Sequence, residues 1–369
     1  MEVNNKTKKL CNIQYIRNDN ILKKIFCHFK KDKLFNIARY NKGLQKRLKI
    51  DVKDYEDYYK TIVLELEVIY KEIYSRNKFI NIVIDKYFHI YFNDNKEEIK
   101  RDYFTRNETI KKITIIIDYE VKSLCELFKY CTCIKRINFI KFFRKDIVDM
   151  SQMFEGCSSL IELNLSNFKT NNVIDMSRMF LGCKLLKKLN LSKFDTSKVN
   201  DMTRLFDSCS ALEELNISNF DTNNVKDMSY MFQSCSALKE LNIYNFNTEK
   251  VNNMCNMFDG CSSLLKLNIG NFNTYLVTDM SEMFRECNSL EELDISNFNI
   301  YNVKTMNSMF YGCKSLKKLN FPDSHKNSKT KRNNMYYGCD ALERNFGEKY
   351  IFKIPYQLRY NYLDFFSIQ

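Results

Sequence analysis

The chain has 369 residues, of which 44% are hydrophobic and only 2 are proline, so it has enough apolar material for a folded core. Its formal net charge is +13, and residues 1–50 hold 14 Lys or Arg against three acidic residues. The remainder is nearly balanced, which argues against nucleic-acid binding there. No apolar run reaches membrane-spanning length and residues 1–20 lack a secretory pattern, so we expect an intracellular, cytoplasmic protein.

The first predicted elements are two or three short helices in the basic segment, residues 1–55. Apolar residues recur there at helical spacing, with the charged run Lys31–Lys33 as a separator. The runs Ile21-Leu-Lys-Lys-Ile-Phe-Cys-His-Phe29 and Lys33-Leu-Phe-Asn-Ile-Ala-Arg-Tyr40 resemble an F-box, a helical module that docks on an adaptor of ubiquitin ligases. A generic helical cap is the alternative interpretation. The resemblance implies that the adaptor would be bound by Ile21, Leu22, Ile25, Phe26 and Phe29.

Residues 56–108 are predicted to form a small α/β cap. They are rich in Tyr, Ile and Phe, and apolar and polar residues alternate around residues 79–84 and 87–92, as in half-buried strands.

The main feature of the sequence is an internal repeat in residues 109–345. Nine cysteines fall 26 residues apart without an insertion or deletion. A fixed period of this kind indicates a solenoid, in which each unit contacts only its neighbours. A shortened first unit starts near residue 109, where Ile110, Ile113 and Ile115 fit the strand of the repeat. The cysteines are Cys131, Cys157, Cys183, Cys209, Cys235, Cys261, Cys287, Cys313 and Cys339.

The first half of each unit is predicted to be a short strand. In the unit that begins at Cys157, the pattern L-x-x-L-x-L is carried by Leu160, Leu163 and Leu165. Because side chains alternate along a strand, positions 163 and 165 point to one side and positions 162, 164 and 166 to the other. Positions in other units are named below by their equivalent in this unit.

The second half of each unit is predicted to be a short helix. Apolar residues from Val173 to Cys183 recur at spacings of three, four and seven. Asp175, just before the helix, would accept hydrogen bonds from its first amides. Gly182 would end it in the left-handed conformation.

Three runs carry a resemblance to a known family. They are Asp175-Met-Ser-Arg-Met-Phe180, Cys209-Ser-Ala-Leu-Glu-Glu-Leu-Asn-Ile-Ser-Asn-Phe220 and Cys235-Ser-Ala-Leu-Lys-Glu-Leu-Asn-Ile243. These runs are similar to the leucine-rich repeats of BspA-like surface proteins of bacteria and protists. The resemblance implies an α/β leucine-rich-repeat solenoid that serves as a binding scaffold without catalytic chemistry. Similar repeats also occur in intracellular proteins.

The cysteine column has three interpretations. We favour packed, reduced thiols, because position 183 lies on the apolar face and free cysteine is commonly buried. A disulfide ladder suits a spacing of about 5 Å between units, but nine cysteines leave one unpaired. A zinc site is the third interpretation, but its only closely spaced ligands would be Cys131 and Cys133, and no histidine lies between His89 and His325. We expect no metal and no cofactor.

The same histidine gap argues against catalysis. Serines such as Ser177 and Ser229 recur, but a nucleophilic serine needs a base and an oxyanion site. The sequence shows no glycine-rich phosphate loop after a strand and no hydrolase or kinase signature. We therefore expect a non-enzymatic protein.

The outward strand positions are the candidate partner-binding surface. Position 164 is predicted to form a side-chain amide ladder. Position 162 carries Glu in some units and Lys in others, as on a mutually paired, solvated face. The consensus breaks at position 166, where Ser is replaced by Tyr244 and then Gly270, and in the next loop at Tyr275 and Leu276. The candidate residues on the concave face are Asn164, Asn190, Asn216, Asn242, Tyr244, Asn268 and Asp294.

These features together predict a monomeric, non-enzymatic scaffold that binds a protein partner through the concave face of a leucine-rich-repeat solenoid, with residues 346–369 as a C-terminal cap. Two alternatives stay open. One is an F-box-like substrate receptor of a ubiquitin ligase, and the other is a surface adhesin, which would need an export route that the sequence does not show.

Overall fold

The computed structural model describes residues 16–26, 31–38, 40–69, 77–82, 86–105, 108–118, 121–322 and 329–342. The chain is a mixed α/β protein that divides into two compact units, residues 1–61 and 62–369. The predicted C-terminal cap and the predicted adaptor residue Phe29 lie outside the described residues. Within the described ranges, none of the helices has the length and apolar character needed to cross a membrane.

The first compact unit is helical in its described part. Its helices are α2 (Asp19–Phe26), α3 (Lys31–Ala38), α4 (Lys42–Leu48) and α5 (Val52–Lys60). The short helices agree with the prediction, and the run Lys31–Lys33 forms the start of α3.

Two of these helices begin with side-chain caps. The Asn41 side chain accepts the Leu44 N–H before α4, at 2.9 Å. Asp51 and Asp54 form a reciprocal capping box at the start of α5. These bonds satisfy amides that have no partner within the helix, and they fix where each helix begins.

The second compact unit starts with a five-stranded sheet in the order β2-β3-β1-β4-β5. The strands are β1 (Ile62–Val68), β2 (Phe88–Phe92), β3 (Lys112–Ile117), β4 (Ile134–Lys141) and β5 (Glu162–Asn164). The predicted first repeat strand is present as β3, but it does not pair with β4. Instead β1 lies between them, antiparallel to both. The inward residues Ile62, Leu64 and Leu66 of β1 are fully or almost fully buried, so this position shields apolar surface on both neighbours.

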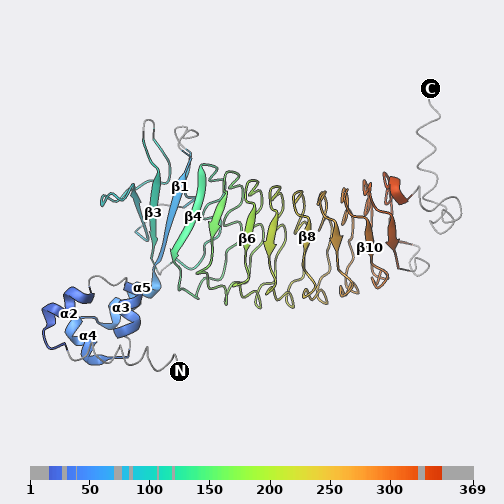
Figure 1. Ribbon diagram of the computed structural model, residues 1–369. Helices are drawn as coiled ribbons and strands as arrows, with labels where there is room; N and C mark the ends of the chain where they lie inside the picture. Colours follow the sequence, from blue (N-terminus) through green and yellow to red (C-terminus); the bar gives the residue numbers. More distant parts are fainter. Residues whose placement is uncertain are drawn as a thin grey trace. The chain divides into compact units, whose positions relative to one another are not determined.

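The 26-residue repeat continues as a row of short parallel strands (Figure 1). Register partners are 26 residues apart, as for Leu189 opposite Leu215. The positions 163 and 165 point inward and 162, 164 and 166 outward, as predicted. The further strands are β6 (Lys188–Asn190), β7 (Glu214–Asn216), β8 (Glu240–Leu241), β9 (Lys266–Leu267), β10 (Glu292–Asp294) and β11 (Lys318–Asn320).

The second half of each unit is not a helix, and this part of the prediction is wrong. Residues 176–183 form consecutive turns, and alternate amides donate to the next unit, as from Phe180 to the Leu205 oxygen at 3.0 Å. An α-helix is about 10 Å wide. The stacked rings of Phe180 and Phe206 lie only 5.7 Å apart, so a helix would not fit at this spacing.

The predicted roles of aspartate and glycine hold within these turns. Asp175 Oδ1 accepts the Ser177 N–H at 2.8 Å, although it starts a run of turns and not a helix. Gly182 has φ +72°, in the left-handed region, and Arg178 also has φ +55°. Two left-handed residues per unit turn the chain repeatedly and bring residues three and four apart to the same side, which gives the same apolar spacing as a helix.

The core is a set of columns that run along the array. From residue 147 to residue 316 the Val, Met, Phe, Cys and first Leu positions are buried, with 0% exposure for Met202, Phe206, Cys209 and Leu212. Phenylalanine rings stack from Phe128 to Phe310 with centroids 5.5–5.8 Å apart. Each unit is therefore packed by its neighbours, as expected for a repeat protein.

Candidate functional site

The cysteine column is buried and its described members are free thiols. From Cys157 to Cys339, each Sγ donates to the carbonyl of the phenylalanine 29 residues earlier, as from Cys209 to Phe180 O at 3.1 Å. Burial raises the pKa of the Cys209 thiol to about 12, so the thiolate needed for nucleophilic attack or metal binding is disfavoured. In the described part of the chain, no three His, Cys, Asp or Glu side chains are grouped so that they could hold a metal ion.

The column at position 164 lies on the exposed side of the strands, together with positions 162 and 166. We call this surface the strand face. The predicted amide bonds between units join Asn164 to Asn138 at 2.9 Å and Asn320 to Asp294 at 2.8 Å. Most of the column has a different role, because its side-chain oxygens accept the N–H two residues ahead. These residues are Asn164, Asn190, Asn216, Asn242, Asn268 and Asp294.

Two other polar columns link the units, and the sequence analysis missed both. Asn219 Nδ2 donates to the Ser192 oxygen of the preceding unit at 2.6 Å. Thr222, which is 1% exposed, bonds to both backbone groups of Asn247 in the next unit. The available signal was the Thr at this position in five successive units, at Thr170, Thr196, Thr222, Thr248 and Thr274.

Charges at positions 161 and 162 are paired between neighbouring units: Arg136 lies 2.9 Å from Glu162, and further along the array the Lys–Glu pairs form two clusters. In the first cluster, Lys188 lies 2.5 Å from Glu214 and Lys187 lies 3.3 Å from Glu213. In the second cluster, lysines and glutamates pair in the same way, as Lys317 with Glu291 at 3.0 Å and Lys318 with Glu292 at 3.6 Å. The predicted mutual pairing is therefore present in these units. The units beginning at residues 235 and 261 lie between the two clusters.

These intervening units expose apolar side chains. Tyr244 is 65% exposed and Leu265 is 49% exposed. Beside Tyr244, a Cβ on Gly270 would meet only the Asn268 Oδ1, at 3.7 Å, so the space next to the tyrosine is open. The adjoining loops add further exposed residues. We define the apolar surface as Tyr244, Leu265, Tyr275, Leu276 and Tyr301.

The predicted adaptor residues fall into two groups on α2. Ile21 and Ile25 are 52% and 37% exposed, whereas Leu22 and Phe26 are buried. The buried pair packs with Ala38 and with Leu44 of α4 in the core of the helical unit. Of the adaptor residues that the structure describes, Ile21 and Ile25 are the two placed to contact another protein, because Leu22 and Phe26 hold the helices together.

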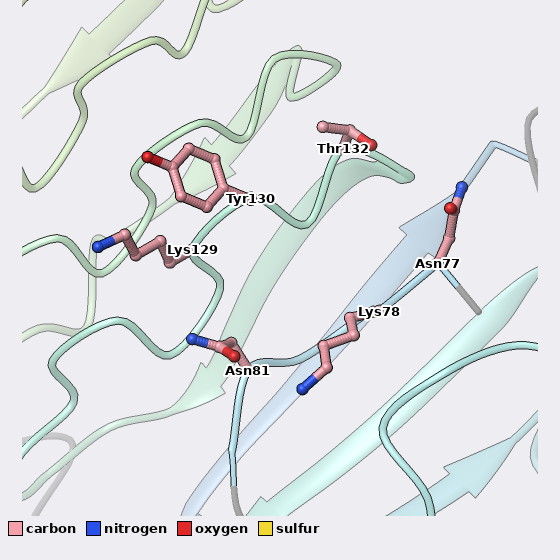
Figure 2. Close-up of a pocket in the computed structure, with 6 residues that line it drawn as sticks. All are labelled: Asn77, Lys78, Asn81, Lys129, Tyr130 and Thr132. Carbon is pink, nitrogen blue, oxygen red and sulfur yellow. The ribbon is translucent and has the colours of Figure 1, made fainter.

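A pocket of about 340 Å³ lies between the segment after β1 and the turn before β4 (Figure 2). Lys78 in its wall lies 2.8 Å from Asp102, and Lys129 lies 2.7 Å from Glu126. Since both ammonium groups are neutralised by carboxylates, the pocket does not have the charge of an anion site, and we assign it no ligand. Its lining residues are Asn77, Lys78, Asn81, Lys129, Tyr130 and Thr132.

Comparison with known families matches the repeated part of the chain twice in tandem. Residues 122–241 and 234–349 each match the family described as Mycoplasma protein of unknown function, DUF285. The matches together span more than half of the 369 residues. The chain belongs to the DUF285 family. No curated protein matches the chain. The first DUF285 match starts at residue 122, between β3 and β4. Residues 1–121, which include the helical unit, lie outside the matches.

Proposed function

We propose that this DUF285 protein is a non-enzymatic leucine-rich-repeat solenoid of the BspA-like kind that binds a protein partner inside the cell. The partner would contact the strand face and its adjoining loops. The observation that carries this proposal is the apolar surface, in which Tyr244 and Leu265 lie in the units between two ion-paired clusters.

The contrast between inward and outward positions supports a binding role. Stacking requires the same buried residue types in every unit, and the Phe and Cys columns meet this requirement. Stacking does not require a particular residue type at the outward position 166, which is Ser in four units and Tyr244 in another. Exposed tyrosines are common energetic anchors at protein interfaces, and a surrounding polar rim excludes water from them.

The proposal assigns no catalytic residue. The buried cysteines have raised pKa values, as for the Cys261 thiol, which burial brings to about 12. Hydroxyls of the recurring serines bond locally or to the next unit, as Ser151 does to Asp149 at 2.7 Å and Ser281 to Thr305 at 2.8 Å. These bonds give the repeated polar residues a structural role.

The test uses substitutions that other units already tolerate. Tyr244→Ser, Tyr275→Asn and Tyr301→Asn restore residue types found at the same positions elsewhere in the repeat. The matched control is Ile174→Asn, which removes a 46% exposed apolar residue at a position where Asn200 stands one unit later. Partners are captured from the source cell with the wild-type chain, purified, and titrated against each variant.

We expect the triple variant to weaken partner binding by at least about 30-fold, which corresponds to about 2 kcal/mol, a typical value for one interface anchor. The Ile174→Asn control should bind as the wild type does. A folded triple variant with an unchanged dissociation constant for every captured partner would contradict the proposal.

A second candidate function rests on the exposed side of α2. Ile21 and Ile25 are four residues apart and both exposed, as apolar contacts for an adaptor of a ubiquitin ligase would be. Ile21→Asp with Ile25→Asp should then abolish adaptor binding without unfolding the helices. Val52→Asp, at a 74% exposed residue of α5, is the control. Equal adaptor binding by the double variant and the control would exclude this role.

A further inference from the structure

His89 on β2 lies between two carboxylates. Its Nδ1 is 2.8 Å from Glu98 Oε1, and its Nε2 is 3.2 Å from Asp118 Oδ2. Glu98 belongs to the segment after β2, and Asp118 directly follows β3. The imidazole ring, which is 30% exposed, therefore connects two segments that are distant in sequence.

The segment after β2 covers the free side of that strand. β2 is the outermost strand of the five-stranded sheet, with β3 on one side. On its other side, Ile99 forms an antiparallel bridge with Ile90 and donates its N–H to the Ile90 oxygen at 2.7 Å. An uncovered edge strand presents unpaired backbone groups to other chains, so this cover protects the sheet.

The two carboxylates favour one protonation state of the ring. A neutral imidazole has one N–H donor and one acceptor, whereas an imidazolium donates from both nitrogens. Ionised carboxylates only accept, so a neutral His89 can bond to Glu98 or to Asp118 but not to both. Burial by itself lowers the pKa of His89, but the hydrogen bonds to the two carboxylates raise it above its ordinary value.

Other charged groups lie on the elements around the ring. Lys100 lies 2.5 Å from Glu98 and shares that carboxylate with His89. On β3 the residue opposite His89 is Ile116, which carries no charge. Lys112 is paired with Glu65 and Asp94, Lys86 lies over the Tyr87 ring, and Lys96 and Glu97 of the covering segment are exposed to solvent.

We propose that His89 is a pH-sensitive latch that holds residues 93–100 over the free edge of β2. When protonated, it bridges Glu98 and Asp118 and keeps Ile99 paired with Ile90. Loss of the proton removes one of the two bonds, loosens the cover and exposes the backbone groups of β2.

The test follows the full-length chain by NMR. The His89 ring is titrated, and the exchange protection factor of the Ile99 amide is measured at about pH 5.5 and about pH 8.5, on either side of the ordinary histidine pKa. We expect His89 to titrate above that ordinary value. Protection of Ile99 should fall about five- to tenfold at the higher pH, as for the loss of one charge-assisted hydrogen bond.

Three variants separate the latch from general effects of pH. His89→Gln should make the Ile99 protection factor independent of pH. Glu98→Gln should lower the His89 pKa, whereas the neighbouring exposed Glu97→Gln should not. Titration of wild-type His89 at or below the ordinary value would overturn the proposal. The same would follow if Ile99 protection changed with pH as much in His89→Gln as in the wild type.

Discussion

The threonine column gives a prediction in which hydrogen bonding and packing lead to opposite results. Thr222 Oγ1 donates to the Asn247 oxygen at 2.8 Å and accepts the Asn247 N–H at 2.8 Å. Thr222→Val keeps the side-chain volume but removes both bonds. Each bond contributes about 1 kcal/mol, so we expect a loss of about 2 kcal/mol in the free energy of unfolding.

The control is Thr222→Ser, which keeps the hydroxyl and removes one buried methyl group, at a cost of about 0.8 kcal/mol. If only packing mattered, Val would be nearly neutral and Ser would be the more harmful change. Urea unfolding followed by circular dichroism gives the order, and exchange of the Asn247 amide shows whether the loss is local. A valine variant at least as stable as the serine variant would refute the reasoning. The same order is expected at Thr196, which bonds to Asp221 in the same way.

Three further predictions follow from the repeat and its first turns. Cys209→Ser should lower the free energy of unfolding by about 1 kcal/mol, because the buried hydroxyl can still donate to Phe180 O but packs less well than sulfur. All 14 cysteines should react as free thiols after unfolding without reductant. Bridged pairs would contradict this expectation. Deleting residues 209–234, one whole unit, should leave a folded chain with a circular dichroism spectrum like that of the wild type. Deleting 13 residues, half of the 26-residue period, should not. If the two deletions unfolded the chain to the same extent, the modular fold would be contradicted. Arg144→Ala should destabilise by about 3 kcal/mol, since the 2% exposed guanidinium bonds to Asp146 and to two backbone oxygens. Arg144 lowers the pKa of Asp146, so the stability from this pair is present above the pKa of Asp146 in the unfolded state and is lost as the pH falls. The effect of Arg144→Ala in acid-unfolding curves should therefore shrink below about pH 4. An effect that grows there would be inconsistent with the pairing.

The alternating strand pattern was predictable, whereas the turn half of the unit was misread. Inward and outward positions follow from the period of two at Leu163 and Leu165, which only a strand satisfies. The spacing from Met176 to Cys183 suits a helix, but consecutive turns with left-handed residues give the same spacing. What decides between them is the distance between units, which is a property of the stack and not of the segment.

The candidate site was predictable only in part, for a similar reason. The sequence identified Tyr244, because it departs from the consensus at position 166. It also identified the mixed Glu and Lys residues at position 162, because they recur at one position of the repeat. It did not separate the exposed Ile21 from the buried Leu22, since both fit one apolar pattern and their burial depends on where α4 packs. It also gave Thr222 no role, because the bonding partner lies in the next unit.

The position of β1 restricts how this chain can change in length. At the N-terminal side the sheet is completed by an antiparallel strand, so a further parallel unit cannot be added next to β4 without displacing it. Downstream, each unit pairs with another of the same register, and a duplication or loss of 26 residues leaves every existing contact type intact. Growth of the array by duplication is therefore open in one direction only.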